Sequence, residues 1–322
     1  MKPNKQIVKE YRVAKDKLSE SSKGCPDSLA LFSASYEDRC SAAASTFKSN
    51  YHCMTSLIFY NKEFLDRGKT SRNLAELSNK CSQFSDNIQK IETSIDNKLD
   101  IVSSFNRYIS ENQIDIENKI ITLDISTFPR HELLLLLRYL RMLNVKNKIR
   151  ILYAKPKKYG NWLSTGFKEV IAVPSFGGTQ IPGRKKLLII LSGFEWERMF
   201  RLWEEHEPSN TVVVIGDPPT NRHFLAINKV KANLILSRAN VIEASAAANN
   251  PFQFFKEMEK IMMQYKREYN IFVSPMNTKI QVVGLFLLFE KYSWFQITMA
   301  IPNDYNVDGY SDGAESIYEF FI

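Results

Sequence analysis

The chain has 322 residues, of which 44% are hydrophobic and 24% are charged. This length suffices for two domains, and this composition excludes an intrinsically disordered chain. The net charge of +8 is compatible with an anionic partner, nucleic acid included, and equally with a solvated basic surface.

Neither a zinc site nor a secretory signal is indicated. Four cysteines (Cys25, Cys40, Cys53 and Cys81) stand far apart without a C-x-x-C pair, and the four histidines are equally scattered, so we expect no metal. The first 18 residues are polar and charged where a signal peptide would be apolar, and the longest apolar runs are too short to cross a bilayer. We therefore expect a reduced, cytosolic protein without membrane contact.

Residues 1–24 predict a charged helical arm that ends at a glycine. From Ser28 onward, apolar runs of strand length alternate with stretches that carry apolar residues at helical spacing. The expected strands of the first half are 28–33, 53–60, 87–94, 119–126, 148–154 and 169–173, and the expected helices are 38–47, 71–84, 99–109 and 129–143.

The stretch at 174–186 holds two prolines and three glycines in its first ten residues and has little periodicity, which is typical of a linker. After it the order starts again. Strands are expected at 186–192, 211–216, 240–245, 270–274, 295–300 and 316–322, and helices at 195–206, 221–232, 251–268 and 279–292. Strands separated by helices indicate crossover connections and parallel sheets.

One short pattern occurs twice. AKPKKYGNWLSTG begins at Ala154, and AIPNDYNVDGYSDG begins at Ala300. The prolines and the tyrosines of the two stretches are each 146 residues apart, and the last serines (Ser164 and Ser311) are 147 apart. Upstream, Ser126 and Ser274 are 148 apart and Ser33 and Ser192 are 159 apart. An offset that shrinks steadily along the chain favours internal duplication with shortened loops, whereas two generic α/β domains with similar turns would explain shared residue types alone.

These patterns predict an α/β protein with two tandem Rossmann-like lobes, mainly parallel sheets and an internal duplication. The expected domains are an N-terminal arm at 1–24, a first lobe at 25–173, a linker at 174–185 and a second lobe at 186–322.

In such sheets, ligands bind outside the carboxyl ends of the strands, where helix N-termini and free backbone N–H groups gather. Each polar residue expected there has an ordinary alternative, because carboxylates and serines also begin helices, Asp217 precedes two prolines in a turn, and the tyrosines could pack on their own loops. The candidate ligand-binding residues are Glu37, Arg39, Asp124, Ser126, Arg130, Tyr159 and Ser164 in the first half, and Glu195, Arg198, Asp217, Ser274, Asn277, Lys279, Tyr305 and Ser311 in the second.

Familiar catalytic motifs are missing from the sequence. It contains no G-x-x-x-x-G-K-[ST] and no G-x-G-x-x-G, which weighs against P-loop ATPases and dinucleotide oxidoreductases. The four histidines lie away from the expected strand ends, which weighs against Ser-His-Asp hydrolases. An enzyme of this sequence would have to use strand-end carboxylates, with or without a metal.

At LDISTFPR, from Leu123, and SPMNTK, from Ser274, the chain resembles Rossmann-like proteins of bacterial defence systems, including the CRISPR-associated Rossmann fold sensors. The resemblance implies a duplicated, single-chain sensor that binds a signalling nucleotide at strand-end loops. The first motif loop is rich in lysine and the second in aspartate, which departs from a symmetric pocket.

Three functions therefore stay open from the sequence. The leading hypothesis is a cytosolic binding or sensor protein for a nucleotide-like or other anionic ligand. The alternatives are a carboxylate-dependent hydrolase or nuclease, and an interaction scaffold for a catalytic protein partner. The sequence identifies no cofactor and leaves open whether the protein is an enzyme.

Overall fold

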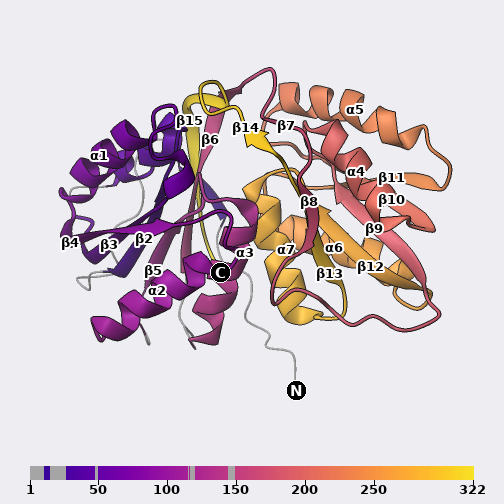
Figure 1. The fold of residues 1–322 in the computed structure, drawn as a ribbon, viewed down its shortest axis with the longest axis horizontal. Helices are drawn as coiled ribbons and strands as arrows, with labels where there is room; N and C mark the ends of the chain where they lie inside the picture. The colour runs from indigo at the N-terminus through magenta and orange to yellow at the C-terminus, as the bar shows by residue number, and fades with distance from the viewer. Residues whose placement is uncertain (1–10, 15–26, 48–49, 115, 117–119, 144–148) are drawn as a thin grey trace. The chain divides into compact units, whose positions relative to one another are not determined.

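The computed structural model describes residues 11–14, 27–47, 50–114, 116, 120–143 and 149–322 (Figure 1). The chain forms two compact units. The first unit comprises Met1–Gly160 and Val307–Ile322, and the second unit comprises Asn161–Asn306.

The first unit is built on a seven-stranded sheet with the order β1-β15-β6-β5-β2-β3-β4. Its strands are β1 (Tyr11–Ala14), β2 (Asp27–Ala34), β3 (Cys53–Asn61), β4 (Ser85–Thr93), β5 (Ile121–Asp124), β6 (Ile149–Tyr159) and β15 (Ser311–Phe321), and its helices are α1 (Thr70–Cys81), α2 (Asp100–Glu111) and α3 (Arg130–Met142). Five neighbouring strands, β4, β3, β2, β5 and β6, pair in parallel. Beside β6, β15 pairs antiparallel with β6, and β1 pairs antiparallel with β15.

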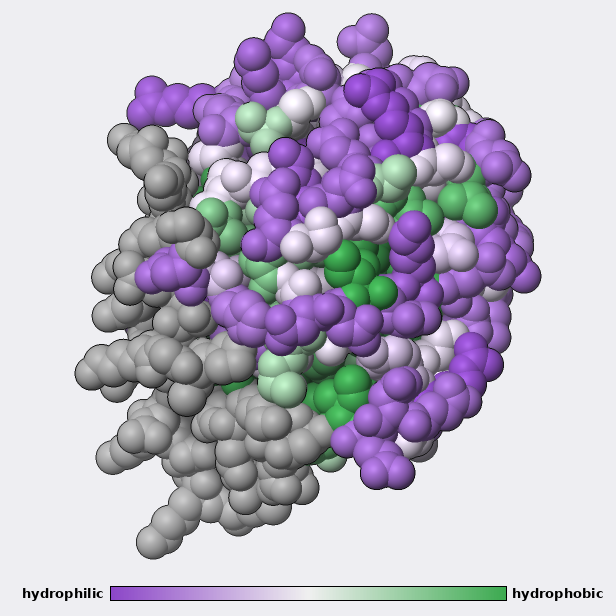
Figure 2. Space-filling model, turned by 90° about the vertical axis from the view of Figure 1, so that its left-hand side faces the viewer, coloured by the Kyte–Doolittle hydropathy of each residue, from purple (hydrophilic) through white to green (hydrophobic). Residues whose placement is uncertain are grey.

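The face shown in Figure 2 is mostly hydrophilic, with hydrophobic residues only in small, separate patches where the view shows described residues. Among the described helices of the whole chain, none has the length and apolar character to cross a membrane.

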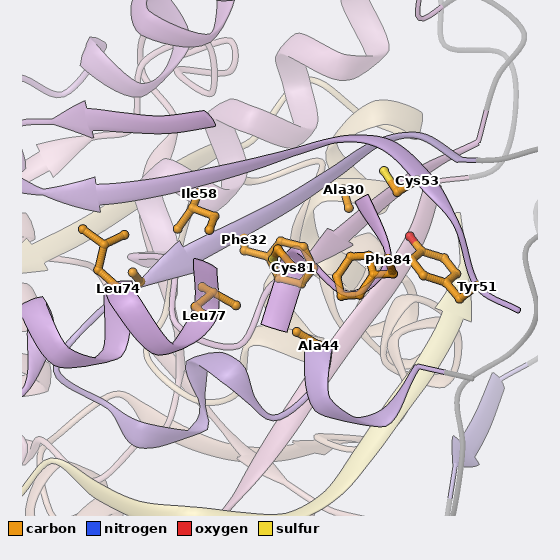
Figure 3. Packing of buried hydrophobic residues seen from close by; sticks show 11 residues of the cluster. Ala30, Phe32, Ala44, Tyr51, Cys53, Ile58, Leu74, Leu77, Cys81 and Phe84 are labelled. Atoms are coloured by element: carbon orange, nitrogen blue, oxygen red, sulfur yellow. The ribbon is translucent and has the colours of Figure 1, made fainter. Parts of the chain in front are cut away.

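In the first unit, hydrophobic side chains pack on both faces of the seven-stranded sheet. Phe32 of β2 and Ile58 of β3 pack with Leu77 of α1 in one cluster (Figure 3). On the other face, the ring of Phe59 lies 6.0 Å from that of Phe105 in α2. Each such side chain contributes about 1.5–3 kcal/mol by leaving water. Helices therefore cover both faces, because successive strand residues point to opposite sides.

The second unit is built on a six-stranded sheet with the order β11-β10-β9-β12-β13-β8 and a two-stranded sheet of β14 and β7. Its strands are β7 (Ser164–Thr165), β8 (Glu169–Ala172), β9 (Lys185–Leu191), β10 (Asn210–Gly216), β11 (Val241–Ala246), β12 (Tyr269–Pro275), β13 (Gln296–Ile301) and β14 (Asp304–Tyr305), and its helices are α4 (Trp196–His206), α5 (Arg222–Leu236), α6 (Pro251–Tyr265) and α7 (Lys279–Lys291).

Alternate residues of its strands again divide between two layers. Leu188 and Ile190 of β9 pack with Met199 of α4 and Ile235 of α5. On the other side of the sheet, α6 and α7 contact each other and β12. Ten residues of α7 are buried, which explains why this segment is apolar around its whole circumference.

Both units share one strand order. Along the chain, the five parallel strands are β2, β3, β4, β5 and β6 in the first unit, and β9, β10, β11, β12 and β13 in the second. When each set is numbered 1 to 5, both sheets have the spatial order 3-2-1-4-5. This is the order of the Rossmann fold, and it reverses between the first and fourth strands. The expected fold class, two Rossmann-like α/β lobes with mainly parallel sheets, is confirmed.

In each sheet, a strand distant in sequence pairs antiparallel with the fifth parallel strand. The antiparallel partner of β6 is β15, near the end of the chain, and in Figure 1 this yellow strand lies beside the magenta β6. The antiparallel partner of β13 is β8, which precedes the second unit's first parallel strand. The units thus differ from the predicted lobes, because residues 161–173 join the second unit and residues 307–322 join the first.

The predicted linker at 174–185 also joins the second unit. Phe176 is fully buried, and its carbonyl accepts from the Ile297 N–H at 2.9 Å. Glycine and proline here mark an irregular segment that packs along β13, since Gly178 adopts φ +65° against the backbone of Phe295.

Two predicted helices are wrong in their described parts. Tyr11–Ala14 of the N-terminal arm forms β1, which supplies backbone partners to β15; the rest of the arm lies outside the described residues. Residues 38–47 form two 3₁₀ turns, Asp38–Ser41 and Ala44–Thr46. Tertiary contacts override the helix propensity of the alanines in this segment, since Ala43 packs beside β6.

Candidate functional site

In the first unit, three predicted site residues meet in one buried cluster. The Glu37 carboxylate accepts from Arg39 Nε at 2.8 Å, from Arg39 Nη2 at 3.1 Å, and from Ser311 Oγ at 2.6 Å. Arg39 Nη1 donates to the Ala154 carbonyl at 2.7 Å. Glu37 is 4% exposed and Arg39 is 2% exposed. We call these residues the first clamp.

The second unit repeats this arrangement with the matching residue types. The Glu195 carboxylate accepts from Arg198 Nη1 at 2.6 Å and from Ser164 Oγ. Arg198 donates through Nε to the Ala300 carbonyl at 3.0 Å and through Nη1 to Ser164 Oγ at 3.3 Å. We call these residues the second clamp.

The clamps give the repeated sequence stretches a structural role. In each unit, the alanine that opens the local stretch supplies the carbonyl for the arginine. The serine comes from the stretch of the other half, Ser311 in the first clamp and Ser164 in the second. Gly166 and Gly313, two residues after these serines, have φ of +67° and +54°, which glycine adopts without strain. Matching residues with matching contacts support the duplication predicted from the sequence.

The contacts of the clamps are structural. Burial alone would lower the pKa of the Arg39 guanidinium, but the adjacent Glu37 carboxylate more than offsets this, and the pKa is raised. Arg39 therefore stays charged, and the carboxylate oxygens of both clamps accept hydrogen bonds from internal donors. Neither glutamate is placed to act as a general base, which requires a carboxylate that reaches substrate.

Asp124 and Ser126 also form an internal contact. Asp124 Oδ1 accepts from the Ser126 N–H at 2.9 Å and from its hydroxyl. Ser126 Oγ in turn accepts from the Ala154 N–H at 2.7 Å. Both residues are at most 2% exposed, so this pair joins the end of β5 to β6.

The two matched tyrosines belong to different units. Tyr159 belongs to the first unit, where its ring lies 6.4 Å from that of Tyr310, and burial raises the pKa of its hydroxyl. Tyr310 also lies 5.7 Å from Tyr36, and Tyr36 lies 5.5 Å from Phe64. These aromatic side chains line the strand ends of the first unit. Tyr305 instead lies in β14 of the second unit.

Two cations occupy equivalent positions at the strand-end edges. Arg130 is the first residue of α3 and Lys279 is the first residue of α7. Each helix follows the fourth strand of its Rossmann order, and both side chains are half-buried. The helix dipole disfavours a cation at the N-terminus, whereas an anion there would be stabilised by the cation and the dipole together.

In the second unit, the loops after three strands approach one another closely at the point where the strand order reverses. A Cβ on Gly193, after β9, would lie 2.1 Å from the Met276 carbonyl oxygen, after β12. A Cβ on Gly216, at the end of β10, would lie 2.4 Å from the Asn277 amide nitrogen. Sequence reasoning missed these glycines, although a glycine at each of two neighbouring strand ends was a usable signal.

The remaining predicted residues lie apart from the clamps. Ser274 is fully buried at the end of β12, and Asn277 lies half-buried beside it. Asp217 is exposed after β10. Across the ranges that the structure describes, no group of three or more histidine, cysteine, aspartate or glutamate side chains is close enough to hold a metal ion.

No protein-family model matches the chain, and no curated protein matches it. The solved structures that match include a protein from Listeria monocytogenes described as a UDP-N-acetylglucosamine 2-epimerase, with 12% identity over 82% of this chain and 76% of that chain, and a TM-score of 0.23. A TM-score this low supports no inference about function, and the fold assignment depends on the strand order itself.

Proposed function

We propose that this protein binds an anionic, nucleotide-like ligand at the carboxyl ends of its parallel strands. The carrying observation is the matched pair of cations, Arg130 and Lys279, each at the first position of the helix that follows the fourth strand. In Rossmann-like folds, ligands bind outside the carboxyl ends of the strands at the point where the strand order reverses, between the first and fourth strands. Helix N–H groups and the helix dipole there favour negative charge.

The surroundings of the two helix starts support a ligand of this charge. Pro129, at the N-cap of α3, has no side-chain acceptor for the first-turn N–H groups. In the second unit, Gly193 and Gly216 let the loops after the strands on both sides of the switch point pack directly against one another. The net charge of +8 raises the local concentration of anions.

A binding role accounts for the strand-end carboxylates better than hydrolysis does. Glu37 and Glu195 hold arginines, and Asp124 accepts from Ser126. Of the four carboxylates considered for catalysis, Asp217 alone is exposed. The resemblance to defence-system sensors extends the proposal to a signalling nucleotide and a sensor role, for which cyclic oligonucleotides are the appropriate ligands to test.

Isothermal titration against a panel of nucleoside phosphates, cyclic dinucleotides, cyclic oligoadenylates and inorganic phosphate tests the proposal. We expect at least one nucleotide to bind, and Arg130→Ala or Lys279→Ala to weaken that binding by about tenfold, as is usual for the loss of one charge-assisted contact. Lys185→Ala, which removes an exposed lysine at the opposite end of β9, is the matched control and should change the affinity less than twofold.

Absence of heat with every ligand, or an equal loss of affinity in Lys185→Ala, would contradict the proposal.

A second experiment distinguishes binding from hydrolysis. A ligand that binds in the titration is incubated with the protein and Mg²⁺ or Mn²⁺ and analysed by chromatography. We expect it unchanged; turnover that is abolished by Asp217→Ala would establish the hydrolase instead.

A further inference from the structure

We infer that each unit stacks the base of a nucleotide ligand on an aromatic pair at the carboxyl ends of its first two parallel strands. The inference rests on the proposed function and deepens it, because it adds recognition of a base to the binding of a phosphate. The first aromatic pair is Tyr36 with Phe64, and the second aromatic pair is Phe194 with Phe224.

The two aromatic pairs occupy matching positions. Tyr36 and Phe194 directly precede the clamp glutamates, in the loop after the first parallel strand of each unit. Their partners come from the segment after the second parallel strand. Phe64 ends the 3₁₀ turn that follows β3, and Phe224 is the third residue of α5, which follows β10. Each pair therefore joins the ends of two neighbouring strands.

The pairs also match in geometry. In each, the ring centroids lie 5.5 Å apart and the ring planes meet at 78°, which is the edge-to-face arrangement that aromatic rings favour. Phe64 and Phe224 are each 8% exposed, whereas Tyr36 and Phe194 are half-buried. A buried phenylalanine thus supports a ring that reaches the surface at the same place in both units.

The clamps hold the half-buried rings in place. The residue after each ring is the clamp glutamate, which is fixed by a buried arginine. In the first unit, Tyr310 adds a further contact, with its ring 5.7 Å from that of Tyr36. A ring that is already ordered loses little conformational entropy when a base stacks on it. Both aromatic pairs are therefore suited to bind a planar group.

The aromatic pairs lie across the reversal of strand order from the cations of the proposed phosphate site. The pairs follow strands 1 and 2 of each unit, and Arg130 and Lys279 follow strand 4. Strands 1 and 4 are direct neighbours, and neighbouring strands lie about 4.8 Å apart. A nucleotide carries its base one sugar away from its phosphate, so a phosphate at either cation leaves the base within reach of the adjacent strand ends.

Contacts in both units join the two sides of this reversal. In the first unit, the Thr127 hydroxyl, after β5, donates to the Ser33 carbonyl of β2. In the second unit, the Met276 N–H, after β12, donates to the Leu191 carbonyl of β9 at 3.1 Å. These contacts keep the loop that leads to each cation close to the strand that leads to each aromatic pair.

The second aromatic pair has additional aromatic surface around it. Trp196, the first residue of α4, is 36% exposed, and the ring of the exposed His223 lies 6.2 Å from that of Phe224. Every base has a π-face, so stacking on such rings contributes about tenfold or more in affinity and tolerates different bases. The expected ligand class is therefore a nucleotide of any base, rather than a phosphate alone.

Isothermal titration with matched probes tests the inference. The probes are AMP, GMP, CMP and UMP, together with ribose 5-phosphate, which carries a sugar and a phosphate without a base. We expect two nucleotide molecules to bind per chain, each about tenfold or more tightly than ribose 5-phosphate, with little preference among the four bases.

Leucine variants separate stacking from packing. Phe194→Leu and Tyr36→Leu keep an apolar side chain but remove the π-face. We expect each to weaken one of the two nucleotide sites by about tenfold, while the affinity for ribose 5-phosphate changes less than about twofold. Phe194→Tyr and Tyr36→Phe retain a ring and should bind every probe like the wild type.

Two half-buried rings away from the strand-end loops provide matched controls. Phe200 of α4 lies with its ring 5.8 Å from that of Trp203, and Tyr108 lies in the last turn of α2. Phe200→Leu and Tyr108→Leu should leave the affinity for every probe unchanged.

Each unit has its own probe of folding. All four tryptophans, at 162, 196, 203 and 294, belong to the second unit, and Cys40, Cys53 and Cys81 are buried in the first. Tryptophan emission thus reports the second unit, and the reactivity of the buried thiols in a Cys25→Ser background reports the first. Both signals establish that a leucine variant is folded under the conditions of the titration.

Equal affinity for the nucleotides and ribose 5-phosphate, or an equal loss of affinity for both in a leucine variant, would overturn the inference and leave the proposed phosphate binding intact. Fewer than two nucleotide sites per chain would also overturn it, as would a ring-retaining variant that loses as much affinity as its leucine counterpart. Failure of every probe to bind, ribose 5-phosphate included, would contradict the proposed function itself and the inference with it.

Discussion

At the residue scale, the clamps combine strong burial with complete pairing of charges. Removing one partner of a buried ion pair typically costs about 3–5 kcal/mol, because the other charge stays buried without compensation. Glu37→Ala leaves Arg39 in this situation, and we expect it to reduce the free energy of unfolding of the first unit by about 3 kcal/mol, measured by thiol reactivity in urea. Ser311→Ala removes one hydrogen bond and should cost about 1 kcal/mol; equal costs would contradict the clamp.

The buried Glu132 should make the stability of the folded protein depend on pH in an unusual direction. Burial raises the pKa of its carboxyl from 4.5 to about 8, while the Asn61 amide, which donates to it at 2.9 Å, acts in the opposite direction. The folded state therefore keeps this proton at pH values where the unfolded chain has lost it. The resulting stability is present below about pH 4.5 and is lost as the pH rises toward 8.

Glu132→Gln replaces the carboxyl by a neutral group with a similar acceptor. We expect it to increase the free energy of unfolding by about 2–4 kcal/mol at pH 8 and to have little effect at pH 4.5. Urea denaturation at the two pH values measures this difference, and a variant that is destabilised equally at both would show that Glu132 is ionised in the folded protein.

At the element scale, the strand-end loops of the second unit tolerate no side chain at Gly193. The built Cβ would lie 2.1 Å from a carbonyl oxygen, so Gly193→Ala must displace backbone. We expect a loss of about 2–4 kcal/mol in the unfolding free energy reported by tryptophan emission. Gly177→Ala, where the built Cβ meets nothing within 4 Å, is the control and should lie within about 0.5 kcal/mol of the wild type.

Most elements could be predicted from the sequence because their apolar residues repeat at strand or helix spacing. The segment at 38–47 was mispredicted because alanine strongly favours a helix, whereas packing beside β6 overrides that propensity and decides its conformation. The clamp residues were identified as candidates from their positions at strand ends. Their burial against each other could not be predicted, since it depends on contacts between residues as distant as Glu37 and Ser311.

At the scale of the whole molecule, the periodic pattern identifies strands but not the sheet that each strand joins. The repeated stretches are separated by nearly the same number of residues, and this separation is the same whether β15 pairs with β13 or with β6. The sequence therefore predicted two equal lobes in succession, whereas residues 161–306 are inserted between two parts of the first unit.

The insertion also sets an order of events during synthesis. Residues up to 160 leave the ribosome first, but β6 obtains its antiparallel neighbour only when residues 311–321 have been made. At about 5–20 residues per second, this delay lasts roughly 8–30 s. The unit that is translated first is thus completed last, and a nascent chain exposes the edge of β6 throughout that interval.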